Sequence, residues 1–167
     1  MNNELKHQTH EFPPIVDKDS KILILGSFPS VKSRENAFFY MHPQNRFWKI
    51  IGALFNEDAF NMTIEERREF IIRHHIALYD VIEECDIKGS DDNSICNVIP
   101  TNLKELIKDT NIKTIFLLGN KAYENFVKYN PSLIKIGIKL PSSSPANATM
   151  NLDKLIKAWS IIIDKLN

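Results

Sequence analysis

The sequence predicts an α/β domain of three layers, in which helices cover both faces of a central, mainly parallel sheet of four to five strands. Two short runs share one design, a lysine, an apolar stretch and a glycine: KILILG at 21–26 and KTIFLLG at 113–119. Segments with helical spacing of apolar residues follow these runs, and an alternation of strands and helices is typical of a parallel sheet with right-handed crossovers.

The first part of the chain holds the first strand and two helices. Residues 1–11 are polar and are predicted to form a flexible segment, and residues 12–167 a single domain. KILILG reads as a buried parallel strand. NRFWKIIGALF at 45–55 has apolar residues at helical spacing. A second helix is predicted from Thr63, because Glu66 three residues later completes a capping box.

In the second half of the chain, predicted strands and helices alternate more clearly. Residues 76–89 form a mixed stretch that the pattern leaves unassigned, and KGSDDNS after it is a polar turn. The remaining expected elements are a helix at 101–109 capped by Thr101 or Asn102, a strand at 113–119, a helix at 120–130, a strand at 133–141 and a helix at about 152–166.

Bulk composition excludes several classes of protein. Lys plus Arg and Asp plus Glu are both 21, so the formal net charge is zero and binding of nucleic acid by bulk charge is disfavoured. The two cysteines, Cys85 and Cys96, do not form a CxxC pair, and no His or carboxylate spacing suggests a metal site. Without a signal peptide or a membrane-length apolar run, we expect a cytoplasmic protein that needs no metal and no cofactor.

Three polar segments follow the predicted strands: GSFPS at 26–30, GNKAY at 119–123 and PSSSPANA at 141–148. Ligand sites of open α/β sheets form beyond the carboxyl ends of the strands, so these segments are candidates for one site. GSFPS lacks the spacing of a phosphate-binding loop, and the serines and prolines of PSSSPANA fit either a solvated loop or a stiff loop that bonds phosphates without net charge.

FFYMHPQNRFWKII at 38–51 carries many aromatic rings beside polar groups. Phe47 and Trp48 are expected in the core at the start of a helix. An aromatic such as Tyr40 can fold inward or stack on a base. His42 before a proline is either a turn residue or a proton donor, and Asn45 either caps the helix or points its amide into a pocket.

The order and spacing of ILGSFPS, HPQNRFW and LPSSSPANA resemble the uracil-DNA glycosylase superfamily, and within it most of all the hypoxanthine-DNA glycosylase branch. The FPPIV segment and the ALYDVIEEC stretch are also similar to that branch, so the resemblance covers nearly the whole chain. It implies a parallel-sheet fold like that of uracil-DNA glycosylases and an enzyme, expected to be monomeric, that flips a damaged nucleotide out of DNA and hydrolyses its N-glycosidic bond without a cofactor.

Carried over by motif, the resemblance implies three groups of site residues. It places Asn45 and His42 as catalytic groups. The base pocket would be formed by Gly26, Ser27, Phe28, Pro29, Ser30 and Tyr40. The DNA-binding loop would be formed by Pro141, Ser142, Ser143, Ser144, Pro145, Ala146 and Asn147.

The chain departs from the uracil-specific pattern at two points. Phe28 stands where those relatives have an Asp or Asn that activates water, and the second motif lacks the histidine before its Pro-Ser. Both departures favour removal of hypoxanthine over removal of uracil. Three alternatives stay open: excision of uracil or mismatched thymine, a DNA-binding module without catalysis, and an unrelated small-molecule enzyme.

Overall fold

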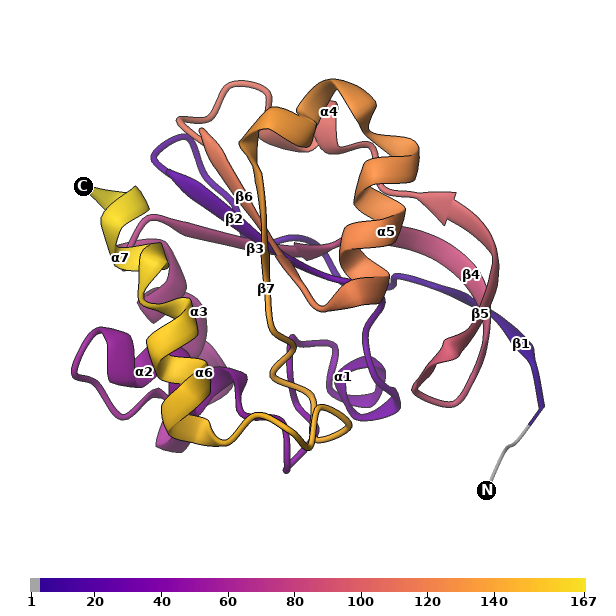
Figure 1. The fold of residues 1–167 in the computed structure, drawn as a ribbon, viewed down its shortest axis with the longest axis horizontal. Helices are drawn as coiled ribbons and strands as arrows, with labels where there is room; N and C mark the ends of the chain where they lie inside the picture. The colour runs from indigo at the N-terminus through magenta and orange to yellow at the C-terminus, as the bar shows by residue number, and fades with distance from the viewer. Residues whose placement is uncertain (1–3) are drawn as a thin grey trace.

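The computed structural model describes residues 4–167, which form two sheets and the helices around them (Figure 1). The strands are β1 (Lys6–Thr9), β2 (Ile22–Gly26), β3 (Ile76–Asp80), β4 (Ile82–Lys88), β5 (Asp91–Pro100), β6 (Thr114–Leu118) and β7 (Gly137–Leu140). The helices are α1 (Val31–Asn36), α2 (Phe47–Leu54), α3 (Ile64–Arg73), α4 (Leu103–Ile107), α5 (Asn120–Tyr129), α6 (Leu152–Trp159) and α7 (Ile161–Leu166), with short 3₁₀ turns η1 (Ala59–Asn61) and η2 (Pro131–Ile136).

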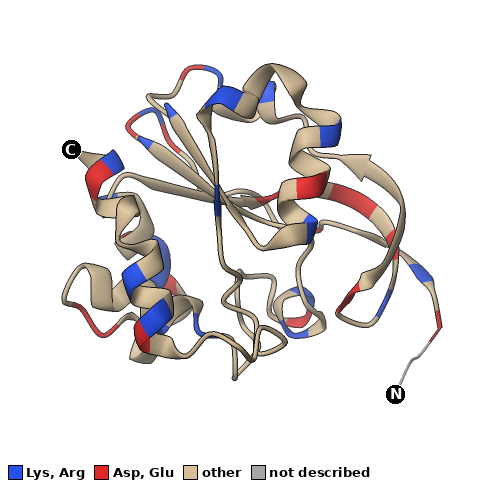
Figure 2. Ribbon diagram, viewed as in Figure 1, with Lys and Arg blue, Asp and Glu red and all other residues tan. Residues whose placement is uncertain are grey.

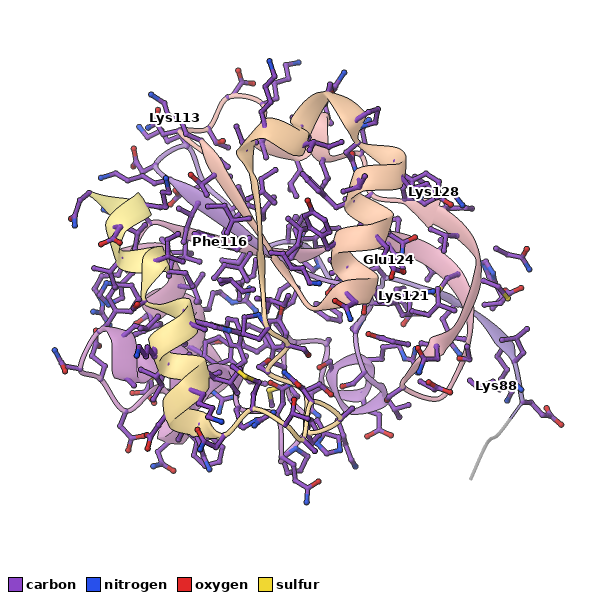
Figure 3. The ribbon with its side chains drawn as sticks, viewed as in Figure 1. Lys88, Lys113, Phe116, Lys121, Glu124 and Lys128 are labelled. Atoms are coloured by element: carbon purple, nitrogen blue, oxygen red, sulfur yellow. The ribbon has the colours of Figure 1, made fainter. Side chains whose placement is uncertain are left out.

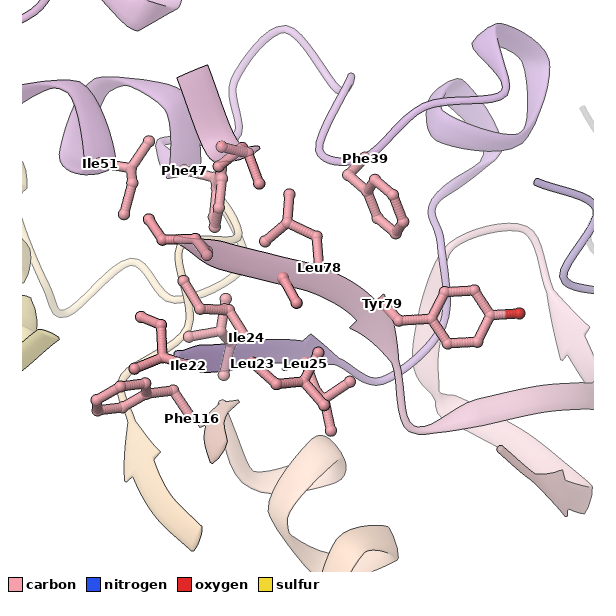
Figure 4. Close-up of a cluster of buried hydrophobic side chains, with 14 of the residues drawn as sticks. Ile22, Leu23, Ile24, Leu25, Phe39, Phe47, Ile51, Leu78, Tyr79 and Phe116 are labelled. Atoms are coloured by element: carbon pink, nitrogen blue, oxygen red, sulfur yellow. The ribbon is translucent and has the colours of Figure 1, made fainter. Parts of the chain in front are cut away.

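The central sheet has four strands in the order β3-β2-β6-β7, and every pair in it is parallel. Helices α2, α3, α6 and α7 lie on one side of this sheet and α5 on the other, as Figure 1 shows. All five residues of β2 are buried, because the strand lies inside the sheet and is covered on both faces (Figure 4). The predicted α/β class is confirmed.

A second sheet, antiparallel and in the order β1-β4-β5, was not expected from the sequence. β4 follows β3 after the single residue Val81, so the unassigned stretch at 76–89 is two strands in succession. The prediction of a loose N-terminal segment is wrong for residues 6–10, since β1 pairs with β4 and His10 is buried. Residues 1–3 lie outside the described residues.

A small apolar cluster links the antiparallel sheet to the end of β2. Its buried members are Phe28, Ile82, Cys85, Ile87 and Ile95. Phe28 therefore anchors the chain that leaves β2 against the second sheet. Burial raises the pKa of the Cys85 thiol to about 11, as is usual for a thiol among apolar side chains.

The helices begin largely where capping residues predict. Thr63 and Glu66 form the expected capping box at the start of α3, and Asn102 caps α4. α5 turns Ala122 and Phe126 toward the core, while Figure 3 shows Glu124 and Lys128 along another side of the helix. Two boundaries differ from the prediction: the last helix divides at Ser160, and residues 133–136 belong to η2 and not to a strand.

Charged side chains are spread over the helices and the outer strands in both signs (Figure 2). The loop between β7 and α6, residues 141–151, carries none. Within residues 4–167, no helix combines the length and apolar character needed to cross a bilayer.

Candidate functional site

The three polar segments meet at one edge of the parallel sheet, as their positions after strands predict. β2 ends at Gly26, β6 at Leu118 and β7 at Leu140. The amide of Gly119 donates a hydrogen bond of 2.8 Å to the carbonyl of Leu140, which ties the second segment to the third. β3 ends at the same edge with Asp80, whose register partner on β2 is Gly26.

The first motif is mostly buried. The Ser27 hydroxyl donates a hydrogen bond of 2.9 Å to Asp92 Oδ2. Phe28 is 7% exposed and Pro29 is buried as well. The Ser30 side chain accepts a hydrogen bond from the amide of Ser33 and so caps α1.

Tyr40 is held in a strained conformation at this edge. Its φ angle is +54°, a value that is unusual for a bulky residue. Its ring stacks on Phe47 with a centroid distance of 4.0 Å and an interplanar angle of 10°. The hydroxyl is buried without a hydrogen-bond partner, and burial followed by the nearby Asp80 charge raises the Tyr40 pKa well above its usual value. Such strain is concentrated at functional sites.

The side-chain oxygen of Asn45 is held at the start of α2, and the role of its amide nitrogen stays a prediction. Asn45 Oδ1 accepts hydrogen bonds from the Phe47 amide, the first amide of α2, at 2.9 Å and from the Ser143 hydroxyl at 2.8 Å. With the oxygen fixed in this way, the orientation of the amide is set, and Asn45 Nδ2 has no partner among residues 4–167. A half-buried amide is left with two free N–H donors.

His42 serves the turn that leads to Asn45. His42 Nδ1 accepts a hydrogen bond of 3.1 Å from the Gln44 amide, and the His42 carbonyl accepts one from the Asn45 amide. In the neutral ring this arrangement places the proton on Nε2. The His42 ring therefore offers one N–H donor beside the motif.

The loop of residues 141–147 is fixed mainly by Arg46. The guanidinium group donates hydrogen bonds to the carbonyls of Ser143, Ser144, Asn147 and Met150. Asn147 Nδ2 in turn donates to the Ser142 carbonyl at 2.9 Å. Pro145 and Ala146 remain exposed at the tip of the loop. The loop is thus rigid at its base and open at its tip.

Sequence reasoning missed three residues that build this edge: Arg46, Asp80 and His10. Arg46 could have been found inside the HPQNRFW motif, where a planar donor that bonds several carbonyls suits a loop clamp. Asp80 could have been noticed as a carboxylate directly after the apolar run IALY. His10 gives no local signal, because it reaches Asp80 across 70 residues of chain.

Two surface hollows lie away from these motifs. One of about 450 Å³ is lined by residues of α4 and η2, and one of about 270 Å³ by residues of β1 and α1. Neither is lined by the residues that the motifs place together, so the packed polar groups define the candidate site. In the described part of the chain, no group of three or more His, Cys, Asp or Glu residues is arranged to hold a metal ion.

Comparison with known proteins identifies relatives of the chain. The family model of the uracil DNA glycosylase superfamily matches residues 13–163. Two proteins named hypoxanthine DNA glycosylase, from Methanosarcina barkeri and Methanosarcina acetivorans, are 35% and 34% identical to the chain, and each match covers 81% of this chain and 86% of the relative.

A solved structure shares the fold over its whole length. It is a solution NMR structure from Methanosarcina acetivorans, provisionally named a uracil DNA glycosylase, with a TM-score of 0.78, 28% identity and coverage of 99% of both chains. The family match, the named relatives and the common fold agree with the motifs at the sheet edge, and the chain belongs to the uracil-DNA glycosylase superfamily.

Proposed function

We propose that this protein is a monofunctional DNA glycosylase that excises hypoxanthine, the deamination product of adenine, in base excision repair. The observation that carries the proposal is the orientation of Asn45. Its oxygen is fixed by two hydrogen bonds while its Nδ2 is free, so the side chain presents a positioned donor. The two relatives named hypoxanthine DNA glycosylase support this choice of base.

A site that offers hydrogen-bond donors but no strong base can hydrolyse the glycosidic bond. The C1′–N9 bond breaks with its electron pair passing to the base, and a water oxygen bonds to C1′. The proton released by that water balances the one that the departing base takes up. Asn45 Nδ2 donates a hydrogen bond to N7 or O6 of hypoxanthine as charge develops there, and His42 is the second donor.

Positioning supplies much of the remaining rate, because the transition state resembles an oxocarbenium ion and is stabilised by electrostatics. Tyr40, whose ring stacks on Phe47, lines the pocket that receives the expelled base. Residues 26–30 form the wall behind the base. No lysine lies in ILGSFPS, HPQNRFW or LPSSSPANA, so the product is an abasic site and the strand is not cut by the enzyme.

The loop of residues 141–147 contacts the DNA backbone through its hydroxyls and exposed amides. Such groups hold phosphates without net positive charge. Expulsion of a base costs a few kcal/mol and least at weakly paired positions, which favours lesions over intact pairs. The protein acts as a cytoplasmic monomer in this proposal.

The test is an excision assay with duplexes that contain hypoxanthine, uracil or a G·T mismatch, followed by alkali and analysis of strand breaks. Breaks in the hypoxanthine duplex alone support the proposal. Breaks confined to uracil or G·T duplexes would assign the other activity of the superfamily. Retardation of the duplexes without breaks would assign a DNA-binding module, for which the aromatic Phe28 at the usual water-activating position is the motivating observation.

A further inference from the structure

Two buried polar atoms without partners lie around Asp80. In the described part of the chain, three buried side-chain atoms have no hydrogen-bond partner: His10 Nδ1, Arg34 Nη1 and the Tyr40 hydroxyl. A buried polar group left unpaired costs free energy, so such groups call for an explanation. His10 contacts Asp80 directly, and the Tyr40 hydroxyl lies near it.

The geometry shows which polar atoms lie close together. Asp80 Oδ2 accepts a hydrogen bond of 2.8 Å from His10 Nε2, while Oδ1 has no partner among residues 4–167. A methyl group added to Gly26 would lie 2.7 Å from Asp80 Oδ1 and 3.2 Å from the Tyr40 hydroxyl. An acceptor and a donor therefore converge beside a residue that has no side chain.

His10 and Asp80 are buried among aromatic side chains. The His10 ring lies 4.5 Å from the ring of Phe12 and 4.2 Å from that of Tyr79, and the Phe28 and Phe39 rings are within 6.2 Å. The side chains of His10 and Asp80 are 0% and 5% exposed.

We propose that Asp80 Oδ1 and the Tyr40 hydroxyl read the lactam edge of the expelled base, the N–H group beside a carbonyl that deamination creates. The proposal rests on the proposed glycosylase function. In hypoxanthine, N1–H donates to Asp80 Oδ1 and O6 accepts from the Tyr40 hydroxyl. Adenine in the same pose presents the reverse order, an acceptor at N1 and a donor at N6, so both protein atoms would be left unpaired.

Buried unpaired groups make this kind of discrimination strong, since a site built to bond a substrate N–H or O–H rejects an analogue without it. Guanine and uracil also carry an N–H beside a carbonyl. The pair therefore separates deaminated adenine from adenine, and the choice between hypoxanthine and those bases depends on the shape of the aromatic walls.

His10 is a positioning residue for this pair. By occupying Oδ2 it leaves Oδ1 as the acceptor that faces Gly26. His10 comes from the chain that follows β1, outside all three motifs. Tyr40 is positioned by its stack on Phe47, so its hydroxyl cannot turn away without loss of that contact.

The test measures binding and not turnover. Duplexes carry a 2′-fluoroarabino nucleotide, which resists hydrolysis, with either hypoxanthine or adenine opposite a tetrahydrofuran spacer so that neither base is paired. The dissociation constants are measured for the wild type, Tyr40→Phe, Asp80→Asn and His10→Gln. Matched controls are Tyr129→Phe, Asp86→Asn and His7→Gln, since His7 also contacts two carboxylates but is exposed.

The wild type is expected to prefer hypoxanthine over adenine. Tyr40→Phe and Asp80→Asn should each lower that preference by about tenfold or more, because each removes one hydrogen bond to the base edge. His10→Gln should lower it less, and the controls should retain it. Thermal melting of each variant shows whether a lost preference for hypoxanthine is accompanied by loss of the fold.

Unchanged preference in folded Tyr40→Phe and Asp80→Asn, or no preference in the wild type, would overturn the proposed reading pair. The proposed function is judged separately by excision of natural deoxyinosine. Wild-type excision with unaltered preference in the variants refutes only the pair. A preference that the variants lose, in a protein that excises nothing, supports the pair and refutes the glycosylase.

Discussion

The Ser143 hydroxyl donates a hydrogen bond of 2.8 Å to Asn45 Oδ1 and so joins two loops that are 98 residues apart in the chain. This bond and the one from the Phe47 amide leave Asn45 with its amide nitrogen free. The donor of one motif is thus oriented by a residue of another.

Ser143→Ala is expected to reduce hypoxanthine excision by about tenfold and the free energy of unfolding by about 1 kcal/mol, because Asn45 loses one of the two bonds that orient it. Single-turnover excision and urea denaturation measure the two effects. Ser160→Ala removes an exposed hydroxyl that bonds only the Lys157 carbonyl, between α6 and α7, and should leave excision unchanged. Equal effects of both changes would contradict the orienting role.

Asn45→Asp should abolish excision while the fold persists. The carboxylate retains the acceptor for the Phe47 amide and the Ser143 hydroxyl, but the donor Nδ2 is gone. Asn45→Ala removes the acceptor of both hydrogen bonds as well and should cost a further ~1 kcal/mol of stability. The measurement pairs single-turnover excision with thermal melting. Full activity in Asn45→Asp would refute the donor role.

Arg46→Lys is expected to loosen the loop of residues 141–147. Lysine cannot bond several carbonyls in one plane as the guanidinium does, so stability should fall by about 1–3 kcal/mol. Hydrogen exchange followed by mass spectrometry should show faster exchange confined to residues 142–150. Arg68→Lys, at an exposed residue whose guanidinium lies 5.2 Å above the Phe38 ring, is the control, and identical exchange in both variants would argue against the clamp.

Gly26→Ala should destabilise the protein by about 1–3 kcal/mol, because the new methyl group would lie 2.7 Å from Asp80 Oδ1. The measurement is urea denaturation, with nuclear magnetic resonance of the His10 ring as a local probe. Gly89→Ala makes a useful contrast, since Gly89 has no atom within 4 Å of the added carbon but a φ of +55°. Gly89→Ala should destabilise the protein through backbone strain alone, and the resonance signals of the His10 ring should not shift.

The pairing of β1 with β4 should depend on pH through His7. Hydrogen bonds that the His7 ring donates to the carboxylates of Glu84 and then Asp86 raise the His7 pKa above 6.5. A raised pKa means that the folded state holds the proton more tightly, so this contribution is complete below pH 6.5 and is lost as the pH rises through the raised pKa. Denaturation midpoints between pH 5 and 9 test this. His7→Gln should remove that part of the dependence, and an unaltered profile would exclude His7 as its source.

The sequence predicts the parallel sheet well because each of its inner strands is a continuous apolar run. Ile22–Gly26 and Thr114–Leu118 are nearly all buried, so lysine, apolar run and glycine suffice to mark them. The antiparallel sheet is not predicted because its strands contain charged residues among the apolar ones. The β4–β5 register also shifts repeatedly, which interrupts the two-residue alternation of apolar and polar side chains.

The site divides in a similar way. Asn45, Tyr40 and the loop of residues 141–147 belong to local motifs and were found, although their roles stay predictions. His10 and Asp80 were not found, because no local pattern links residues that meet only after the second sheet has formed.

The place of His10 has a practical consequence for anyone who shortens this protein. The first ten residues look like a polar leader that could be trimmed before crystallisation or replaced by an affinity tag. Removal through His10 would delete β1, expose the edge of β4 and strip Asp80 of its hydrogen bond. A trimmed protein could keep its main fold and lose its choice of base, so tags belong at the carboxyl end.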